Sequence, residues 1–139
     1  MIEQTQPVQE KHTIVVVVDD DPAVCSSLEF SLGVEGFEVQ TYANGAELLK
    51  EEQMPTHGCV IIDYFLPGMN GLELAIALRE RKISLPIILI TTHPNRALRQ
   101  SAAAEGIEII EKPLLGNSLS ESVRAAVRWA SSAGPQPRA

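Results

Sequence analysis

The sequence predicts an α/β domain built on a doubly wound, five-stranded parallel sheet with five helices. Four short runs of Val, Ile and other apolar residues lack the alternation of a half-exposed strand, which is typical of parallel strands buried on both faces. Segments with helical spacing separate these runs, as parallel strands require. Each run ends in side chains that could hold a phosphate or a metal, and ligands of such sheets lie at those strand ends.

Length and composition limit the possible classes of protein. The 139 residues suffice for one domain, and 45% of them are hydrophobic. The net charge of −7 offers no basic patch, so we expect no direct nucleic-acid binding. Because the chain has no apolar run of membrane-spanning length and starts with polar residues, we expect a cytoplasmic protein without membrane contact. Cys25 and Cys59 are expected to be reduced core residues.

The first two strands flank one helix. A strand is predicted at residues 14–18, and Asp21 followed by Pro22 is typical of an N-cap and the first position of a helix. The Gly-containing segment 33–36 ends this helix. The alternation over residues 37–42 indicates a half-exposed strand near an edge of the sheet.

The middle of the chain repeats the alternation of helix and strand. Asn44 and Glu47 have capping-box spacing, which predicts a short helix before a third strand at residues 59–63. A loop rich in turn residues, 64–70, follows that strand. Residues 71–81 then have the spacing of a helix.

The last third of the chain completes the sheet. Pro86 precedes the fourth strand, residues 87–90, at a position where proline is tolerated. The fifth strand is predicted at residues 107–112. Between these strands, the helix predicted at 95–105 has a thin apolar face: Ala97, Leu98 and Ala102.

A final helix closes the domain. Ser118 and Glu121 have the spacing of a capping box at its start, and apolar residues follow at helical intervals. We expect the domain to span residues 13–131, between flexible tails at 1–12 and 132–139.

The strand order decides which strand ends meet. The flavodoxin-like order 2-1-3-4-5 is one of the two common doubly wound orders, and it makes the first and third strands neighbours. With this order, Asp19 and Asp20 would lie beside Asp63.

These residues suit phosphoryl chemistry. Three gathered carboxylates repel one another unless a proton or a cation intervenes, and Mg²⁺ prefers one or two carboxylates together with water and phosphate oxygens. Adjacent residues at a strand end point in different directions, so one of Asp19 and Asp20 should bind metal directly and the other through water. Lys112 offers a positive charge to phosphoryl oxygens, and Thr91 offers a hydroxyl. An aspartate beside a metal can itself become phosphorylated.

With these motifs the chain resembles the receiver domain of bacterial two-component response regulators, over about residues 13 to 130. Each motif alone is weak, but their order and their placement at strand ends make the resemblance strong. The matching pieces are Val-Val-Asp-Asp-Asp (17–21), Ile-Ile-Asp-Tyr-Phe-Leu-Pro-Gly-Met-Asn-Gly (61–71), Ile-Thr-Thr (90–92) and Glu-Lys-Pro (111–113).

The resemblance implies a role for each site residue. Asp63 would be the phosphoacceptor, Thr91 the hydroxyl that moves to the phosphoryl group, and Lys112 its ion-pair partner, with a cis peptide between Lys112 and Pro113. The implied Mg²⁺ ligands are the carboxylates of Asp20 and Asp63, the backbone carbonyl of Phe65 and, through water, Asp19.

Two positions depart from the family. Ile109 stands three residues before Lys112, where the family often has an aromatic side chain that swings inward with the threonine. Phe65 stands two residues after Asp63, where the family often has a polar side chain. The first departure puts the transmission of a signal in doubt, whereas the phosphorylation chemistry keeps all its residues.

The function implied by the resemblance is phosphorelay signalling. Asp63 would accept a phosphoryl group from a sensor histidine kinase or a phosphotransfer protein with Mg²⁺, and this would switch a surface for a protein output partner or a phosphorylation-dependent homodimer. The chain would then catalyse its own phosphorylation and dephosphorylation and would not be an enzyme for other substrates. Two alternatives stay open: a phosphorylation-independent interaction module, and an Asp-based phosphatase, which needs an acid or base where Phe65 stands.

Overall fold

The computed structural model describes residues 13–114 and 116–133, and a five-stranded parallel sheet forms the centre of this part of the chain. The strands lie in the order β2-β1-β3-β4-β5, which confirms the predicted fold class and topology. The order places β1 and β3 side by side, as the site prediction requires. The strand bounds are β1 (Ile14–Val18), β2 (Glu38–Tyr42), β3 (Gly58–Asp63), β4 (Ile87–Thr91) and β5 (Glu108–Glu111).

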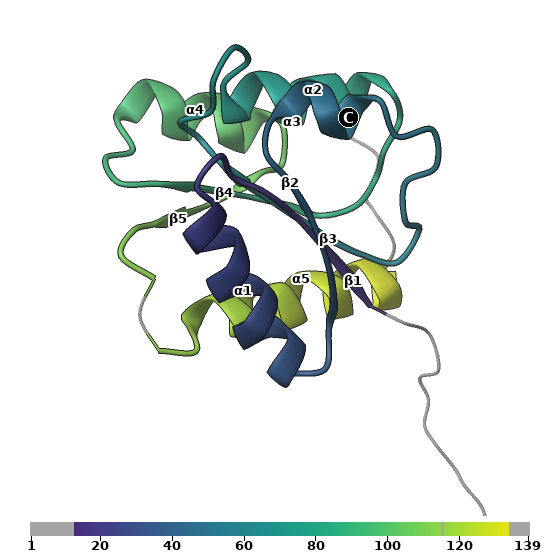
Figure 1. Cartoon of the computed structure of the whole chain (residues 1–139). Helices are drawn as coiled ribbons and strands as arrows, with labels where there is room; N and C mark the ends of the chain where they lie inside the picture. Colours follow the sequence, from purple (N-terminus) through teal and green to yellow (C-terminus); the bar gives the residue numbers. More distant parts are fainter. Residues whose placement is uncertain (1–12, 115, 134–139) are drawn as a thin grey trace, which may run out of the picture.

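Helices cover both faces of the sheet (Figure 1). On one face lie α1 (Pro22–Val34) and α5 (Ser118–Ala133). The other face carries α2 (Gly45–Leu49), α3 (Gly71–Glu80) and α4 (Arg96–Ala104). The last helix continues two residues past the expected domain end at 131. The tails expected at 1–12 and over the remaining residues, 134–139, lie outside the described residues.

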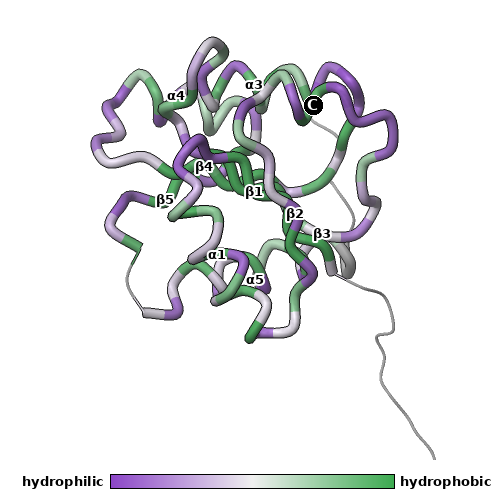
Figure 2. The backbone as a smooth tube through the Cα atoms, in the orientation of Figure 1, coloured by the Kyte–Doolittle hydropathy of each residue, from purple (hydrophilic) through white to green (hydrophobic). Residues whose placement is uncertain are grey.

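The core has two layers because successive residues of a strand point to opposite faces. In β1, Val15 and Val17 pack with α1 and α5, whereas Val16 and Val18 pack with α2, α3 and α4. In Figure 2 the centre of the sheet, where β1 and β4 lie, is coloured as hydrophobic. Both faces of β1, β3 and β4 are therefore buried, which explains why their sequences are continuous apolar runs.

Side-chain caps fix the starts of several helices. Asp21 accepts a hydrogen bond from the Ala23 backbone N–H at the start of α1, as predicted. At α2, Asn44 accepts from the Glu47 N–H over 2.9 Å, while the Glu47 carboxylate reaches the Ala43 N–H. That is a variant of the predicted capping box, in which the glutamate accepts a hydrogen bond from the N–H of the residue before the N-cap and not from the N-cap itself.

Two predictions at α4 and α5 are wrong. Ala97 is exposed, and the buried residues of α4 are Leu98 and Ala102. Ser118 is already the first residue of α5, so it is not the N-cap, and the Glu121 N–H donates to the backbone oxygen of Asn117. In α4 the other two residues of the predicted face are buried, so only Ala97 is misplaced. At α5 the helix begins one residue earlier than the predicted capping box implies.

The register of the sheet brings several polar residues together at the end where the parallel strands finish. Val18 pairs with Ile62, so Asp19 and Asp63 follow at the same level on neighbouring strands. On the side of β3 away from β1, Thr91 of β4 pairs with Glu111 of β5, and Lys112 comes next along the chain. In the described part of the chain, no helix is long and apolar enough to cross a membrane.

Candidate phosphorylation and metal site

Three carboxylates meet where β1 and β3 end. Asp19, Asp20 and Asp63 each place a carboxylate oxygen within 4.8 Å of the others. Asp19 and Asp63 are buried, whereas Asp20 is exposed. The predicted convergence of these acids is therefore what the structure shows, and it follows from the adjacency of the two strands.

Asp63 is the most constrained of the three acids. Asp63 is 7% exposed, and this burial raises the pKa of its carboxyl group. The nearby charge of Asp19 raises the pKa further, whereas the charge of Lys112 lowers it. The Lys112 Nζ lies 3.4 Å from Asp63 Oδ1, at ion-pair distance but without hydrogen-bond geometry. That buried oxygen has no hydrogen-bond partner among the residues the structure describes.

Asp19 and Asp20 occupy different environments although they are neighbours in sequence. Asp19 Oδ1 accepts a hydrogen bond from the Asp21 N–H over 2.9 Å, and burial raises the pKa of its carboxyl group. Asp20 is exposed at the rim of the cluster. The structure thus separates the two acids, one committed to the backbone and one facing solvent.

The arrangement fits a hard divalent cation. Buried polar atoms are almost always satisfied, so an unpartnered carboxylate oxygen beside two further acids needs a positive charge that the acids themselves do not supply. Lys112 provides part of it. All the donor atoms are oxygens, which Mg²⁺ prefers, and soft sulfur ligands are not part of this cluster.

Thr91 and Lys112 lie at the ends of the two strands that follow β3 in the sheet. Thr91 ends β4 and is 1% exposed, and its backbone oxygen accepts the Lys112 N–H over 2.8 Å. This backbone bond joins the hydroxyl-bearing residue to the lysine. The peptide bond between Lys112 and Pro113 is cis, as the resemblance implied.

The loop after Asp63 is tied back onto the sheet. The Tyr64 N–H donates to the Ile90 oxygen, and the Tyr64 oxygen accepts the N–H groups of Leu66 and Gly71. Phe65, between these anchors, is 63% exposed, and its ring meets the ring of Tyr64 edge-on at 5.0 Å.

A complete capping box ends this loop, and the sequence interpretation missed it. Asn70 accepts from the Glu73 N–H, and the Glu73 carboxylate accepts from the Asn70 N–H. The same Asn-x-x-Glu spacing was recognised at Asn44, so the signal was present in the sequence.

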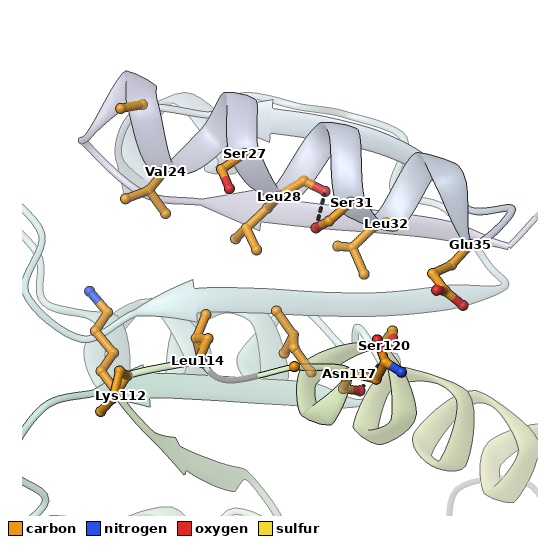
Figure 3. Close-up of a pocket in the computed structure, with 14 residues that line it drawn as sticks. Val24, Ser27, Leu28, Ser31, Leu32, Glu35, Lys112, Leu114, Asn117 and Ser120 are labelled. Carbon is orange, nitrogen blue, oxygen red and sulfur yellow. Dashed lines mark hydrogen bonds between the residues drawn. The ribbon is translucent and has the colours of Figure 1, made fainter.

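A groove leads away from the site between α1 and α5 (Figure 3). Its volume is about 560 Å³, with Lys112 at one end and Glu35 at the other. Leucines from both helices form its walls, and the hydroxyls of Ser31 and Ser120 are bonded to backbone oxygens of their own helical turns. Sequence patterns gave no sign of this groove.

The sheet order, the acidic cluster at the ends of β1 and β3, and the lysine after β5 are the features expected of a receiver domain. The response regulator receiver domain family matches this chain over residues 15–124, and the chain belongs to this family. It is therefore a signalling domain of the two-component type, as the motifs predicted.

Similar proteins agree with this assignment. The transcriptional regulatory protein TdiR of Thauera aromatica is 32% identical over 114 residues, which are 81% of this chain and 50% of that protein. The phosphate regulon transcriptional regulatory protein PhoB of Rhizobium meliloti is 36% identical over 121 residues, which are 84% of this chain and 52% of PhoB. The chain spans about half the length of these relatives.

A solved structure adds a chemical comparison. The response regulator TrrA of Thermotoga maritima, in complex with Mg²⁺ and BeF, has a TM-score of 0.70 and 32% identity, covering 82% of this chain and 98% of TrrA.

Proposed function

We propose that Asp63 accepts a phosphoryl group in a Mg²⁺-dependent reaction and that this modification switches a protein-interaction surface. The buried Asp63 carboxylate carries the proposal. Its Oδ1 accepts no hydrogen bond from the described residues, lies 3.4 Å from the Lys112 ammonium, and is beside two further acids. A Mg²⁺-bound relative with the same fold supports it.

Each side chain would have a distinct task. A bound Mg²⁺ would neutralise the charge of the transferring group; Asp20, Asp63 and the Phe65 carbonyl would hold it, with Asp19 acting through water. An ionised oxygen of Asp63 attacks phosphorus while the bond to the leaving nitrogen of a phosphohistidine breaks, and the electron pair leaves with the imidazole. Lys112 would pair with the oxygens of the new acyl phosphate.

Signal output would follow from Thr91. Its buried position at the end of β4 places it one strand from Asp63, so a phosphoryl group that draws its hydroxyl inward would also pull on the adjoining loop and α4. Leu98 and Ala102 are the buried residues of α4, so this helix has a small anchoring face. Such a helix can change position at low cost, which shifts an existing equilibrium between two conformations.

The proposed partners follow from the family. A sensor histidine kinase or a phosphotransfer protein would supply the phosphoryl group in the cytoplasm. A protein partner, or a second copy of the phosphorylated chain, would read the result.

Intact mass spectrometry tests the acceptor. After incubation with acetyl phosphate and Mg²⁺, the unmodified protein should gain one phosphoryl group, and Asp63→Asn should gain none because an amide oxygen is a poor nucleophile. Asp21→Asn is the matched control: it removes a neighbouring, exposed acid but keeps a side chain that caps α1.

The possible outcomes are distinct. A mass gain on Asp63→Asn would place the acceptor elsewhere. No gain on the unmodified protein with several phosphodonors would favour the phosphorylation-independent module instead.

A further inference from the structure

The backbone of Asp63 and the start of α3 meet at Gly71. The Gly71 N–H donates to the Tyr64 oxygen over 2.8 Å, so α3 begins directly against the residue that follows the proposed phosphoacceptor. Gly71 is buried. The segment from Tyr64 to Gly71 is therefore a closed loop whose two ends touch.

This contact leaves no room for a side chain. A Cβ atom at position 71 would lie 2.6 Å from the Asp63 carbonyl oxygen, 2.8 Å from the Tyr64 Cα and 2.7 Å from a methyl carbon of Leu89. Two of these three neighbours are backbone atoms of β3 and of the residue after it, and they cannot rotate away. A larger residue would have to move the loop or the start of the helix.

Gly45 and Gly33 differ from Gly71 in this respect. At Gly45, a Cβ would lie 3.2 Å from the sulfur of Met69 and 3.3 Å from a methyl carbon of Leu74, both of which belong to flexible side chains. At Gly33, in the last turns of α1, it would meet no atom within 4 Å. Gly58, the first residue of β3, also lies directly against backbone, that of Ile14, but it is at the opposite end of the strand from Asp63. Of these four glycines, Gly71 is the one whose backbone contact closes the loop that carries Phe65.

We propose that Gly71 is a positioning residue for divalent-cation binding. It closes the loop onto Asp63 and Tyr64, and this closure holds the Phe65 carbonyl oxygen level with the Asp63 carboxylate. This rests on the proposed function. The capping box at Asn70 and Glu73 holds the helix end of the loop, and the Tyr64 N–H bond to Ile90 holds the strand end, so displacement at position 71 is passed to the residues between them. Phe65 is one of these residues.

Mg²⁺ affinity, measured by calorimetric titration of metal-free protein well below its melting temperature, tests the proposal. Gly71→Ala should weaken binding about tenfold or more, the effect typical of residues that orient ligands. Gly33→Ala should leave the affinity unchanged. Val123→Ala, a buried cavity variant on the opposite face of the sheet, should lose stability and keep its affinity.

A second measurement needs no variant. In the unmodified, metal-free protein, the amide protons of Leu66 and Gly71 should exchange with solvent as slowly as those of β3, because Gly71 closes the loop before any cation binds. Rapid exchange that slows only after Mg²⁺ is added would overturn the proposal.

The titration separates the two proposals. If the unmodified protein binds Mg²⁺ and Gly71→Ala binds it equally well, the positioning role is wrong and the proposed function stands. Equal losses of affinity in Gly71→Ala and Val123→Ala would show a general effect of stability and would also overturn it. If the unmodified protein binds no Mg²⁺, both proposals fail.

Discussion

At the scale of single residues, the central feature is the charge at Asp63. Burial and the neighbouring Asp19 raise its pKa, so the folded state favours the protonated carboxyl group more than the unfolded chain does. The favourable contribution of the protonated form is complete below the unfolded value near 3.8 and is lost as the pH rises through the folded value. Where the pH exceeds the folded value, the metal-free protein therefore holds an ionised carboxylate that destabilises it.

Asp63→Asn should increase the free energy of unfolding of the metal-free protein at neutral pH, because it removes this charge. The increase should shrink as the pH falls toward 4, where the carboxyl group of the unmodified protein takes up a proton. Urea unfolding at several pH values measures both effects. Glu52→Gln changes the net charge equally at an exposed position and should show little change; a lower stability of Asp63→Asn at neutral pH would contradict the repulsion.

At the scale of elements, the turn after α3 contains a strained residue. Lys82 has a φ of 64°, a left-handed conformation that glycine usually supplies after a helix, and its N–H donates to the Arg79 oxygen. The next N–H, of Ile83, bonds to the Leu78 oxygen, so the backbone of this turn is well satisfied despite the strain.

Lys82→Gly should stabilise the protein by roughly 0.5–1 kcal/mol, since relief of the left-handed strain exceeds the added flexibility of the unfolded chain. Thermal unfolding measures the change. Lys82→Ala removes the same exposed charge but retains the strain, so a gain of equal size in both variants would assign the effect to charge.

The elements also show what sequence patterns can predict. Apolar runs located β1, β3 and β4 because both of their faces are buried, and strand order then brought Asp19, Asp20, Asp63 and Lys112 together. The close approach at Gly71 and the unpartnered oxygen of Asp63 could not be predicted, because they depend on how separate backbones meet in space. The phase of α4 failed at Ala97 for a related reason: alanine gives a weak signal for burial.

At the scale of the whole molecule, arginines connect the helices at the end of the sheet where the strands begin, opposite the site. Arg124 of α5 pairs with Glu35 after α1 and lies 5.3 Å above the ring of Phe37. On the other face, Arg81 donates to the backbone oxygens of Leu49 and Glu51 after α2. These contacts stabilise one end of the domain. At the other end, the three carboxylates of the acidic cluster repel one another.

Mg²⁺ should therefore raise the melting temperature of the protein. A cation that binds the folded state alone adds about 2.7 kcal/mol at one hundred times its dissociation constant. Asp20→Asn should raise the melting temperature without metal and reduce the response to Mg²⁺. NaCl at equal ionic strength is the control, because salt screens repulsion without specific binding; an equal shift with both salts would contradict a metal site.

The order of the site residues along the chain has one more consequence. All three acids precede the turn at Lys82, whereas Thr91, at the end of β4, and Lys112, directly after β5, follow it. A chain severed at that exposed turn would yield one fragment with the carboxylates and one with the counter-charge. Neither fragment could acquire a phosphoryl group alone, so labelling by acetyl phosphate would report the reassembly of a split protein.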